Sequence, residues 1–302
     1  MKIRFDEQVA IVTGAGRGLG RSHAIAMASK GAKVVVNDFS GSNEISENAK
    51  SVVKEIISAG GEAIAHGANV ANFDQVQSMV GEAIDKWGRV DILVNNAGIL
   101  RDKTFLKMSV EDMREVIDVH LMGSLNCSKA VWEIMREQSY GRIVLTSSSS
   151  GLYGNFGQTN YGAAKMAMVG IMNTLHLEGM KYNIKVNCLA PTAGTAMTDG
   201  LFPEPVFKLM PPESVSPGVV FLCSEDAPSR KVLAAGGGSF AIFKGFETEG
   251  VNLLPDELSA ESVAKYWDKI EGENNMQEPQ SGSAQSQKFA MQAAEKLGLD
   301  LS

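Results

Sequence analysis

Cysteine and histidine are scarce in this chain, which argues against a disulfide framework and against a metal site. Its 302 residues include four histidines and only three cysteines, Cys127, Cys188 and Cys223. A disulfide-stabilised fold carries an even set of closely spaced cysteines, and a zinc site needs ligands at short, regular intervals. We therefore expect reduced thiols, no bound metal and a reducing compartment.

Positive charge and long apolar runs are scarce as well. The formal net charge is -7 and no basic cluster stands out, which argues against nucleic acid as a partner. No apolar run approaches the roughly 20 residues of a membrane-spanning helix. The first residues, MKIRFDEQ, lack the apolar centre of a signal peptide, and the last, GLDLS, do not form a peroxisomal targeting tripeptide. These features predict a cytoplasmic protein that acts without a membrane.

The chain is rich in short apolar segments that alternate with helical patterns. Hydrophobic residues make up 44% and charged residues 21%, a balance typical of a globular protein. The length suffices for one large α/β domain, residues 1–250, followed by an appendage, residues 251–302. Strands are predicted at residues 9–12, 33–36, 63–65, 90–94, 143–145 and 185–189, with a last apolar run at 239–246. Helices are predicted at residues 43–59, 74–87, 109–137 and 216–223. One more helix follows the strand at 143–145 and ends at about residue 180.

The appendage differs from the rest of the chain in composition. Residues 259–270 predict one amphipathic helix with Val263, Tyr266, Trp267 and Ile270 on one side. Residues 271–286 are polar and typical of a linker, and residues 287–297 form a last helical candidate. Because an exposed tryptophan is unfavourable, we expect the appendage to pack on the main domain or on a partner subunit.

A glycine-rich turn links the first predicted strand to the first helix. The stretch TGAGRGLG spans residues 13–20, and a helix, a second strand and an acidic residue follow it. A dinucleotide-binding fingerprint requires this order, because the glycines let the backbone approach a pyrophosphate at the helix N-terminus. A purely structural turn is the alternative. The candidate contacts in the turn are Gly14, Arg17, Gly18, Leu19 and Gly20.

Asp38 ends the second predicted strand, 18 residues after Gly20. A carboxylate here can accept hydrogen bonds from both hydroxyls of the adenosine ribose and would repel a 2′-phosphate, so it favours NAD over NADP. Arg17 has the opposite tendency, because a guanidinium could pair with that phosphate. We give Asp38 the greater weight because its position faces the 2′ oxygen. A role as a helix cap is the alternative for Asp38.

Later segments would complete a cofactor site. The loop after the third strand could hold an adenine ring, and small residues after the fourth strand allow a cofactor to come close. Residues 195–210 combine proline, glycine and isolated apolar residues, which is typical of a lid. The charged loop 101–103 could contact a charged substrate, although a solvated loop is the simpler interpretation. The candidates in these segments are Asn69, Val70, Asn96, Ala97, Gly98 and Thr195.

Ser148, Tyr161 and Lys165 form the catalytic candidate. Ser148 follows the strand at 143–145, while Tyr161 and Lys165, four residues apart, share one face of the next helix. A tyrosine with a pKa of about 10 is a poor base at neutral pH. A cation one turn away stabilises the phenolate and lowers that pKa, so the trio can move a proton to or from an alcohol oxygen. A Tyr/Lys pair on an ordinary helix surface is the alternative.

In this order and spacing, TGAGRGLG, NNAG, Ser148 and the Y-x-x-x-K pair resemble the short-chain dehydrogenase/reductase family over about residues 5–250. The resemblance implies a doubly wound (Rossmann) parallel α/β sheet of about seven strands with a helical C-terminal extension. It implies that Tyr161 is the acid/base and that Ser148 positions the substrate oxygen. Lys165 would bind the nicotinamide ribose and lower the pKa of Tyr161. Tyr161 would also contact the cofactor. We also expect a homo-oligomer, a dimer or a tetramer.

Within that family, longer stretches are similar to the (3R)-hydroxyacyl-CoA dehydrogenase domain of peroxisomal multifunctional enzymes of type 2. They include NNAGILRDKTF, VHLMGS, SSGLYGNFGQTNY and PDELSAESVAKYW. In this resemblance His120 replaces the usual asparagine of the catalytic tetrad, and Asn69 stands where an aspartate is usual. The implied function is NAD-dependent hydride transfer between NAD and a small-molecule substrate, a (3R)-3-hydroxyacyl-CoA. A steroid or another secondary alcohol is the alternative substrate, and a non-catalytic NAD-binding sensor is the alternative class.

Overall fold

The computed structural model describes residues 2–42, 44–198, 200 and 203–300. The chain divides into two compact units, Met1–Phe243 and Lys244–Ser302, which are described separately. The first unit ends with its last strand, seven residues before the domain boundary predicted at residue 250. Of the predicted lid segment, positions 199, 201 and 202 lie outside the described residues.

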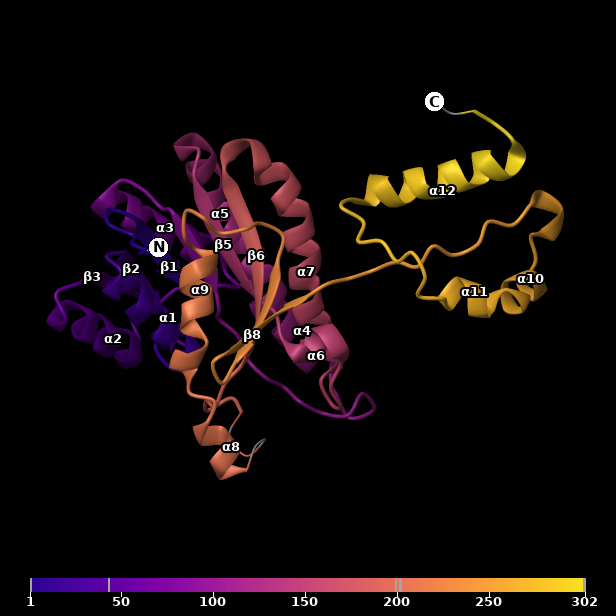
Figure 1. Cartoon of the computed structure of the whole chain (residues 1–302). Coiled ribbons are helices and arrows are strands. Elements are labelled where there is room, and N and C mark those ends of the chain that lie inside the picture. The colour runs from indigo at the N-terminus through magenta and orange to yellow at the C-terminus, as the bar shows by residue number, and fades with distance from the viewer. Residues whose placement is uncertain (1, 43, 199, 201–202, 301–302) are drawn as a thin grey trace. The chain divides into compact units, whose positions relative to one another are not determined.

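A single sheet of eight strands forms the centre of the first unit (Figure 1). Its spatial order is β3-β2-β1-β4-β5-β6-β7-β8, and the neighbouring pairs are parallel except for β7 and β8. The chain therefore winds outward in both directions from β1, which confirms the predicted doubly wound α/β sheet. The strands are Val9–Val12 (β1), Lys33–Asn37 (β2), Glu62–His66 (β3), Ile92–Asn95 (β4), Gly141–Thr146 (β5), Ile184–Thr192 (β6), Val232–Gly236 (β7) and Ser239–Phe243 (β8).

The sheet has eight strands where about seven were predicted, and β7 is the one that the sequence pattern did not reveal. Its sequence, VLAAG, ends in alanines and a glycine, which have low strand propensity. A tight turn then reverses the chain into β8, which makes the last strand antiparallel. Gly237 and Gly238 in this turn have φ angles of 55° and 78°, a conformation that glycine adopts without strain.

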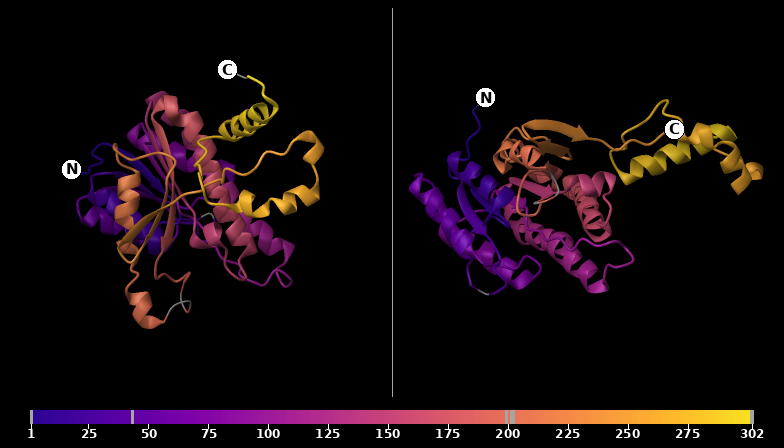
Figure 2. Two further views of the ribbon diagram at one scale, coloured as in Figure 1. Left: turned by 45° about the vertical axis from the view of Figure 1, so that its right-hand side comes forward. Right: turned by 90° about the horizontal axis from the view of Figure 1, so that it is seen from below.

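Helices cover both faces of the sheet (Figures 1 and 2). Residues of α1, α2 and α9 pack on one face, and residues of α3, α5 and α7 pack on the other. The helices of the first unit are Gly18–Ser29 (α1), Glu47–Ser58 (α2), Phe73–Trp87 (α3), Val110–Ile117 (α4), Gly123–Gln138 (α5), Ser149–Tyr153 (α6), Thr159–Gly179 (α7), Glu204–Lys208 (α8) and Ser216–Leu222 (α9), with short 3-10 turns at Met180–Tyr182 and Pro212–Ser214.

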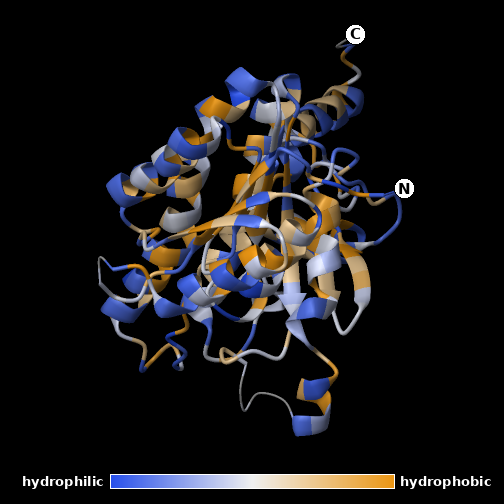
Figure 3. Cartoon of the chain, turned by 90° about the vertical axis from the view of Figure 1, so that its left-hand side faces the viewer, coloured by the Kyte–Doolittle hydropathy of each residue, from blue (hydrophilic) through white to orange (hydrophobic). Residues whose placement is uncertain are grey.

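Alternation along the strands builds the two halves of the core. In β1, Ala10 and Val12 pack with the α1, α2 and α9 layer, whereas Val9 and Ile11 pack with the α3, α5 and α7 layer. All four side chains are fully buried, because a central parallel strand has helices on both sides. Figure 3 shows the strands as mainly hydrophobic and many of the surrounding helical residues as hydrophilic.

Two helices differ from the prediction for local reasons. The helix predicted at residues 43–59 begins at Glu47, because the Ser46 hydroxyl accepts a hydrogen bond of 3.0 Å from the Ala49 N–H and caps it. Asn43 lies outside the described residues. The helix predicted at residues 109–137 is interrupted between α4 and α5 by a π-helical turn, Asp118–Met122. Such turns often mark functional sites, and this one contains His120.

The second unit contains the helices Ala260–Lys265 (α10), Trp267–Glu271 (α11) and Gly282–Leu297 (α12), with a 3-10 turn at Pro255–Glu257. The single helix predicted at residues 259–270 is divided, because Tyr266 leaves the helical conformation (φ −99°, ψ 11°). An antiparallel bridge pairs Glu247 with Gln277, and Lys288 Nζ lies 2.9 Å from the Glu247 carboxylate. Trp267 is 53% exposed in the single chain, so its packing on a partner subunit stays a prediction.

Arg142, at the start of β5, is fully buried and joins two loops to the strand. Its guanidinium donates to the carbonyl oxygens of Asn183 at 2.7 Å, Ser224 at 2.9 Å and Glu225 at 3.2 Å. We predict that Arg142→Met lowers the free energy of unfolding by about 2–4 kcal/mol, because buried carbonyls lose their donors. Urea unfolding measures the effect. Arg114→Met, at an exposed position of α4, is the control, and equal stability of the two variants would contradict the prediction.

Candidate active site

The predicted site residues gather at one edge of the sheet. β1, β2, β4 and β5 are parallel, so the segments that follow them leave from the same edge. The glycine turn follows β1, Asp38 follows β2, Asn96 follows β4, and Ser148 comes shortly after β5. The strand order reverses between β1 and β4, and ligands of open α/β sheets bind at this edge beside such a reversal.

Close backbone approach explains the glycines of the turn between β1 and α1. Gly14 has a φ of 61°, and a methyl group on it would lie 2.8 Å from the Cα atom of Ala97. A methyl group on Gly20 would clash with the carbonyl oxygen of Gly14. Side chains at these two positions would force the turn away from β4. The structure therefore has the tight, side-chain-free cradle that a pyrophosphate needs.

Thr13, which the sequence analysis did not single out, fastens β1 to the segment after β4. Its Oγ1 accepts hydrogen bonds of 3.0 Å from the backbone N–H groups of Asn96 and Ala97. The Asn96 amide donates in return to the carbonyl oxygens of Thr13 at 2.9 Å and Gly14 at 3.2 Å. These bonds hold Asn96, Ala97 and Gly98 against the glycine turn. A hydroxyl residue directly before the turn was the only signal in the sequence.

The start of α1 suits an anionic group. The N-cap residue Arg17 makes no side-chain hydrogen bond to the first turn, and that turn carries no acidic residue. The backbone N–H groups of the first turn of α1 are therefore available to a phosphate. The positive end of the helix stabilises the charge of such a group. Thr195 lies over the same turn, with its Cγ2 atom 3.4 Å from where a methyl group on Gly18 would be. Leu19 is partly buried and packs on the core.

Asp38 lies directly beside the glycine turn, since a side chain on Gly16 would clash with its carboxylate. Its Oδ2 atom accepts a hydrogen bond of 2.7 Å from the hydroxyl of Ser46, the residue that caps α2. The helix cap considered for Asp38 is therefore supplied by Ser46, and Ser46 orients the carboxylate. Arg17 is exposed.

The loop after β3 lies next to the end of β2, because the Asn37 side chain donates to the Ala68 carbonyl at 2.9 Å. The Asn69 side chain accepts a hydrogen bond of 3.0 Å from the Ala71 N–H, which stabilises the loop itself. Val70 is 6% exposed and packs closely against Gly123 at the start of α5. The role of both residues in adenine binding stays a prediction.

Ser148 is the N-cap of α6 and is 8% exposed. Its hydroxyl accepts a hydrogen bond of 3.2 Å from the Ser150 N–H, which fixes the direction of its oxygen. α6 lies directly on α7, because a methyl group on Gly151 would be 2.8 Å from the Cβ atom of Lys165. The short helix thus carries Ser148 to the face of α7 that holds Tyr161 and Lys165.

Tyr161, Lys165 and His120 lie close together in space. The ammonium of Lys165 lies 5.5 Å from the centre of the Tyr161 ring, and the His120 ring meets the Tyr161 ring edge-on at a centroid distance of 5.2 Å. Lys165 is 4% exposed and donates to the Thr146 carbonyl at 2.7 Å. The structure therefore brings together the three predicted catalytic residues and His120.

Burial controls the protonation of these groups. It lowers the pKa of Lys165 to about 7, and it raises the pKa of Tyr161 above its usual value, although the hydrogen bond from Ser148 opposes that rise. The net direction is therefore opposite to the predicted lowering, and the contribution of Lys165 to it stays a prediction. The physical reason is that burial of the phenol itself disfavours the charged phenolate, and the charge of Asp102 adds to this effect.

His120 is 2% exposed and lies in the π-helical turn. Burial, and then the charge of Lys165, lower its pKa to about 3, so the ring is neutral at neutral pH. Its Nε2 atom lies 2.8 Å from the carbonyl oxygen of Ile99 and 3.1 Å from the Ile99 N–H, so it donates to the first or accepts from the second according to the tautomer. Its Nδ1 atom is buried without a protein partner. Gly98 is required beside it, because a side chain there would clash with the imidazole.

The charged loop after β4 is largely neutralised by α4. Arg101 pairs with Glu115 at 2.8 Å, and Lys103 pairs with Asp112 at 2.7 Å, so the solvated-loop interpretation fits these two cations. Asp102 instead accepts a hydrogen bond from Gln158, at the start of α7. The sequence analysis did not single out Gln158, because its role depends on a contact between distant segments.

Other kinds of site find no support in the described part of the chain. It contains no group of three or more His, Cys, Asp or Glu residues arranged to hold a metal ion. Within the same residues, no helix is both long and apolar enough to cross a membrane. The three cysteines are free and buried, and burial raises the pKa of each thiol.

Proteins of known family share both sequence and fold with this chain. The chain is 46% identical to a short-chain type dehydrogenase/reductase of Mycobacterium tuberculosis over 269 residues, 87% of this chain and 94% of that protein. It is 44% identical to the peroxisomal multifunctional enzyme type 2 of Mus musculus, covering 92% of this chain but only 38% of that protein. It is also 44% identical to a 3-oxoacyl-(acyl-carrier-protein) reductase of Synechocystis over 227 residues, 73% of this chain and 90% of that protein.

Solved structures agree with these relatives. The full-length peroxisomal multifunctional enzyme type 2 of Drosophila melanogaster superposes with a TM-score of 0.82 at 36% identity, over 98% of this chain and 51% of that one. A 7α-hydroxysteroid dehydrogenase, complexed with NADH and 7-oxo glycochenodeoxycholic acid, superposes with a TM-score of 0.72 at 31% identity, over 79% of this chain and 96% of that one. The family model for short chain dehydrogenase matches residues 8–204. The chain is an oxidoreductase that belongs to the short-chain dehydrogenase/reductase family.

Proposed function

We propose that this enzyme transfers a hydride between NAD and a secondary alcohol or ketone, with a (3R)-3-hydroxyacyl-CoA as its substrate. The observation that carries the proposal is the meeting of Ser148, Tyr161 and Lys165 at the sheet edge where the glycine turn forms its cradle. A cofactor-binding sensor would need only the cradle. The buried proton-transfer group beside it supports turnover.

In this proposal the chain's own residues manage the proton. The bound nicotinamide supplies or accepts the hydride. The Ser148 hydroxyl donates a hydrogen bond to the substrate oxygen, and the Tyr161 hydroxyl exchanges a proton with it. Because burial raises the pKa of Tyr161, the phenol is protonated at neutral pH and ready to donate to a ketone oxygen. Alcohol oxidation needs the phenolate and should accelerate as the pH rises.

The acyl-CoA substrate and the homo-oligomer rest on resemblance, whereas the location was predicted from the sequence itself. The segments NNAGILRDKTF and SSGLYGNFGQTNY are similar to a (3R)-hydroxyacyl-CoA dehydrogenase domain. A relative named for 3-oxoacyl groups covers 73% of the chain at 44% identity, which supports an acyl substrate. The cytoplasmic location predicted from the sequence stands beside relatives that are named peroxisomal. A homo-oligomer remains part of the proposal.

A steroid alcohol is the second candidate substrate. The neighbour with 31% identity and a TM-score of 0.72 is a 7α-hydroxysteroid dehydrogenase complexed with NADH. That neighbour supports NAD as the cofactor and shows that a related fold accepts a bulky ring system. Both candidate substrates present a secondary alcohol oxygen, which is the only group that Ser148 and Tyr161 need to contact.

A hydride-transfer assay with a substrate panel tests the proposal. We expect reduction of NAD with (3R)-3-hydroxyacyl-CoA esters and little turnover of the (3S) epimers or of hydroxysteroids. Tyr161→Phe should lower kcat by at least about 100-fold, because general acid–base catalysis contributes that much. NAD binding should stay nearly intact, since the variant removes only a transferable proton. A Tyr161→Phe enzyme with an unchanged kcat would show that another group moves the proton.

Asp38 should make the enzyme prefer NAD over NADP. We expect Asp38→Ala to weaken NAD binding about 10-fold, because a charge-assisted hydrogen bond to the ribose is lost. The same variant should bind NADP better than the unmodified protein, because the charge that repels the 2′-phosphate is gone. Fluorescence titration with both reduced cofactors measures the change. Equal or stronger binding of NADPH by the unmodified protein would instead assign the main role to Arg17.

His120 should complete a proton path in its neutral form. Its Nδ1 atom, which is buried without a protein partner, can form a hydrogen bond with a water in either tautomer, and that water would link Lys165 to solvent. We expect His120→Ala to lower kcat more than it raises KM, whereas His120→Asn, which also offers donor and acceptor atoms, should keep much of the rate. Kinetics from about pH 6 to 9 span the region around the usual histidine pKa. An unchanged kcat in His120→Ala throughout would make the residue purely structural.

A further inference from the structure

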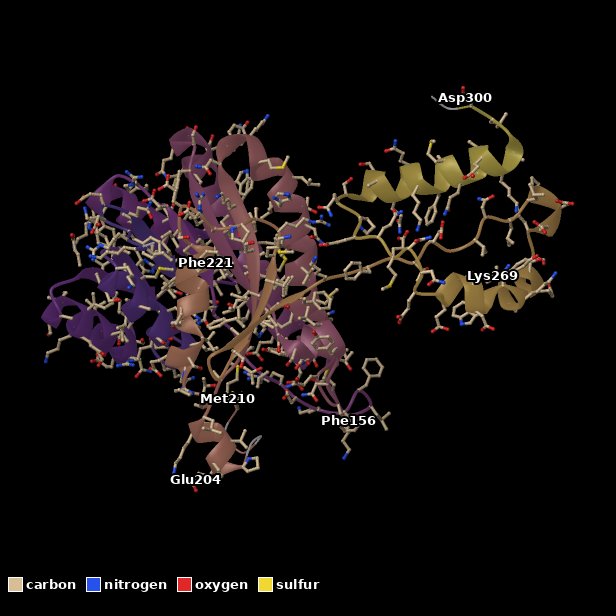
Figure 4. All side chains as sticks on the ribbon, in the orientation of Figure 1. Phe156, Glu204, Met210, Phe221, Lys269 and Asp300 are labelled. Carbon is tan, nitrogen blue, oxygen red and sulfur yellow. The ribbon has the colours of Figure 1, made fainter. Side chains whose placement is uncertain are left out.

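Two loops on the substrate side of the site are joined by polar contacts. One follows β4 and includes residues 99–108, and the other, residues 154–158, connects α6 to α7. The Lys103 N–H donates to the Gly157 carbonyl at 3.0 Å, and the Asn160 amide donates to the Arg101 carbonyl at 3.2 Å. Phe156 at the tip of the second loop is 88% exposed (Figure 4), so apolar burial of this side chain does not hold that loop in place.

Gln158 is the centre of these contacts and is only 6% exposed. Its Nε2 atom donates to the Asp102 carboxylate at 2.6 Å. Its Oε1 atom accepts hydrogen bonds from the Ser150 hydroxyl at 2.7 Å and from the Asn155 amide at 3.1 Å. Rotating the amide by half a turn would place a donor against two donors and an acceptor against a carboxylate. The three partners therefore fix the orientation of this amide.

Gln158 connects to the segments that carry both catalytic hydroxyl groups, to α6 through its side chain and to α7 through its backbone. Ser150, which donates to Gln158, also donates its N–H to the Ser148 hydroxyl at 3.2 Å. The backbone carbonyl of Gln158 accepts a hydrogen bond of 2.7 Å from the Gly162 N–H, in the helical turn that contains Tyr161. Gln158 therefore contacts α6 next to Ser148 and begins the helix that carries Tyr161.

We propose that Gln158 is a positioning residue, which holds Asp102 and Ser150 at the same time and so fixes the Ser148 and Tyr161 hydroxyls and keeps the Asp102 carboxylate near the phenol. The inference rests on the proposed function, because Ser148 and Tyr161 are its reacting groups. Gln158 itself contacts neither substrate nor cofactor. It acts through the two hydroxyls and through the charge that it restrains.

The restrained charge has an electrostatic consequence. The Tyr161 ring lies near Lys165 on its own helix and near His120 in the π-helical turn. Its pKa is also influenced by Ser148 of α6 and by Asp102, an exposed residue of the loop after β4. The negative charge of Asp102 contributes to the raised pKa of Tyr161, because it disfavours a nearby phenolate. Removing that charge should lower the tyrosine pKa and shift the pH dependence of alcohol oxidation towards lower pH.

A charge-swap cycle tests the positioning role. Gln158→Glu places a carboxylate against Asp102, and we expect it to lower kcat by about 10- to 100-fold with a small change in KM, as misplaced catalytic groups do. Adding Asp102→Asn restores a donor opposite the new carboxylate, so the double variant should recover most of the loss. Gln77→Glu, an equal change on the exposed side of α3, is the control. A double variant as slow as Gln158→Glu would overturn the inference.

A second measurement needs no substrate. Ultraviolet titration reports ionisation of tyrosines, and subtracting the curve of Tyr161→Phe isolates Tyr161. We expect the Tyr161 pKa to fall in Asp102→Asn, to rise in Gln158→Glu and to return towards the original value in the double variant. If the unmodified enzyme turned over no alcohol of the panel, the proposed function would fail, whereas the titration would still test the positioning role of Gln158. Identical Tyr161 curves in all variants, with NADH binding retained as proof of folding, would overturn the inference.

Discussion

Two hydrogen bonds in opposite directions tie the end of β5 to the middle of α7, and the site depends on them. The Lys165 ammonium donates to the Thr146 carbonyl at 2.7 Å, and the Ser147 hydroxyl donates to the Lys165 carbonyl at 2.8 Å. Both are buried, so neither competes with water. Because one helical residue is bound through its side chain and its backbone, α7 can neither slide nor rotate against the strand. Ser148 and Tyr161 then face each other as a result of chain connectivity.

The same burial that makes this tie strong changes the charges of the site. A histidine with a pKa of about 3 carries no charge beside Tyr161 at neutral pH, and a desolvated lysine with a pKa of about 7 carries only part of one. A hydrogen bond to the Thr146 carbonyl sets the direction of the Lys165 side chain. The carboxylate of Asp102, although it is exposed to solvent, also contributes to the raised pKa of Tyr161.

The sequence revealed those parts of the site that lie close together along the chain. The glycine turn depends on local backbone conformation, and the spacing of Tyr161 and Lys165 is a property of one helix, so both could be recognised without a structure. Thr13 and Gln158 could not, because their roles come from contacts with residues more than fifty positions away. The predicted direction of the Tyr161 pKa was also wrong, because the sequence does not show how deeply the phenol itself is buried.

The geometry also explains why the reaction class follows from this structure more directly than the substrate does. In the proposed reaction Ser148 and Tyr161 need only a carbon–oxygen group, and they are held by a strand, two helices and buried hydrogen bonds. An acyl-CoA and a steroid alcohol differ far from that group, where the substrate would meet the loops after β4 and between α6 and α7. Those loops expose Phe105, Leu106 and Phe156, at 68%, 93% and 88%. Their apolar side chains have few internal contacts to satisfy, so substitutions there can change which alcohol is bound while the proton-transfer geometry stays the same.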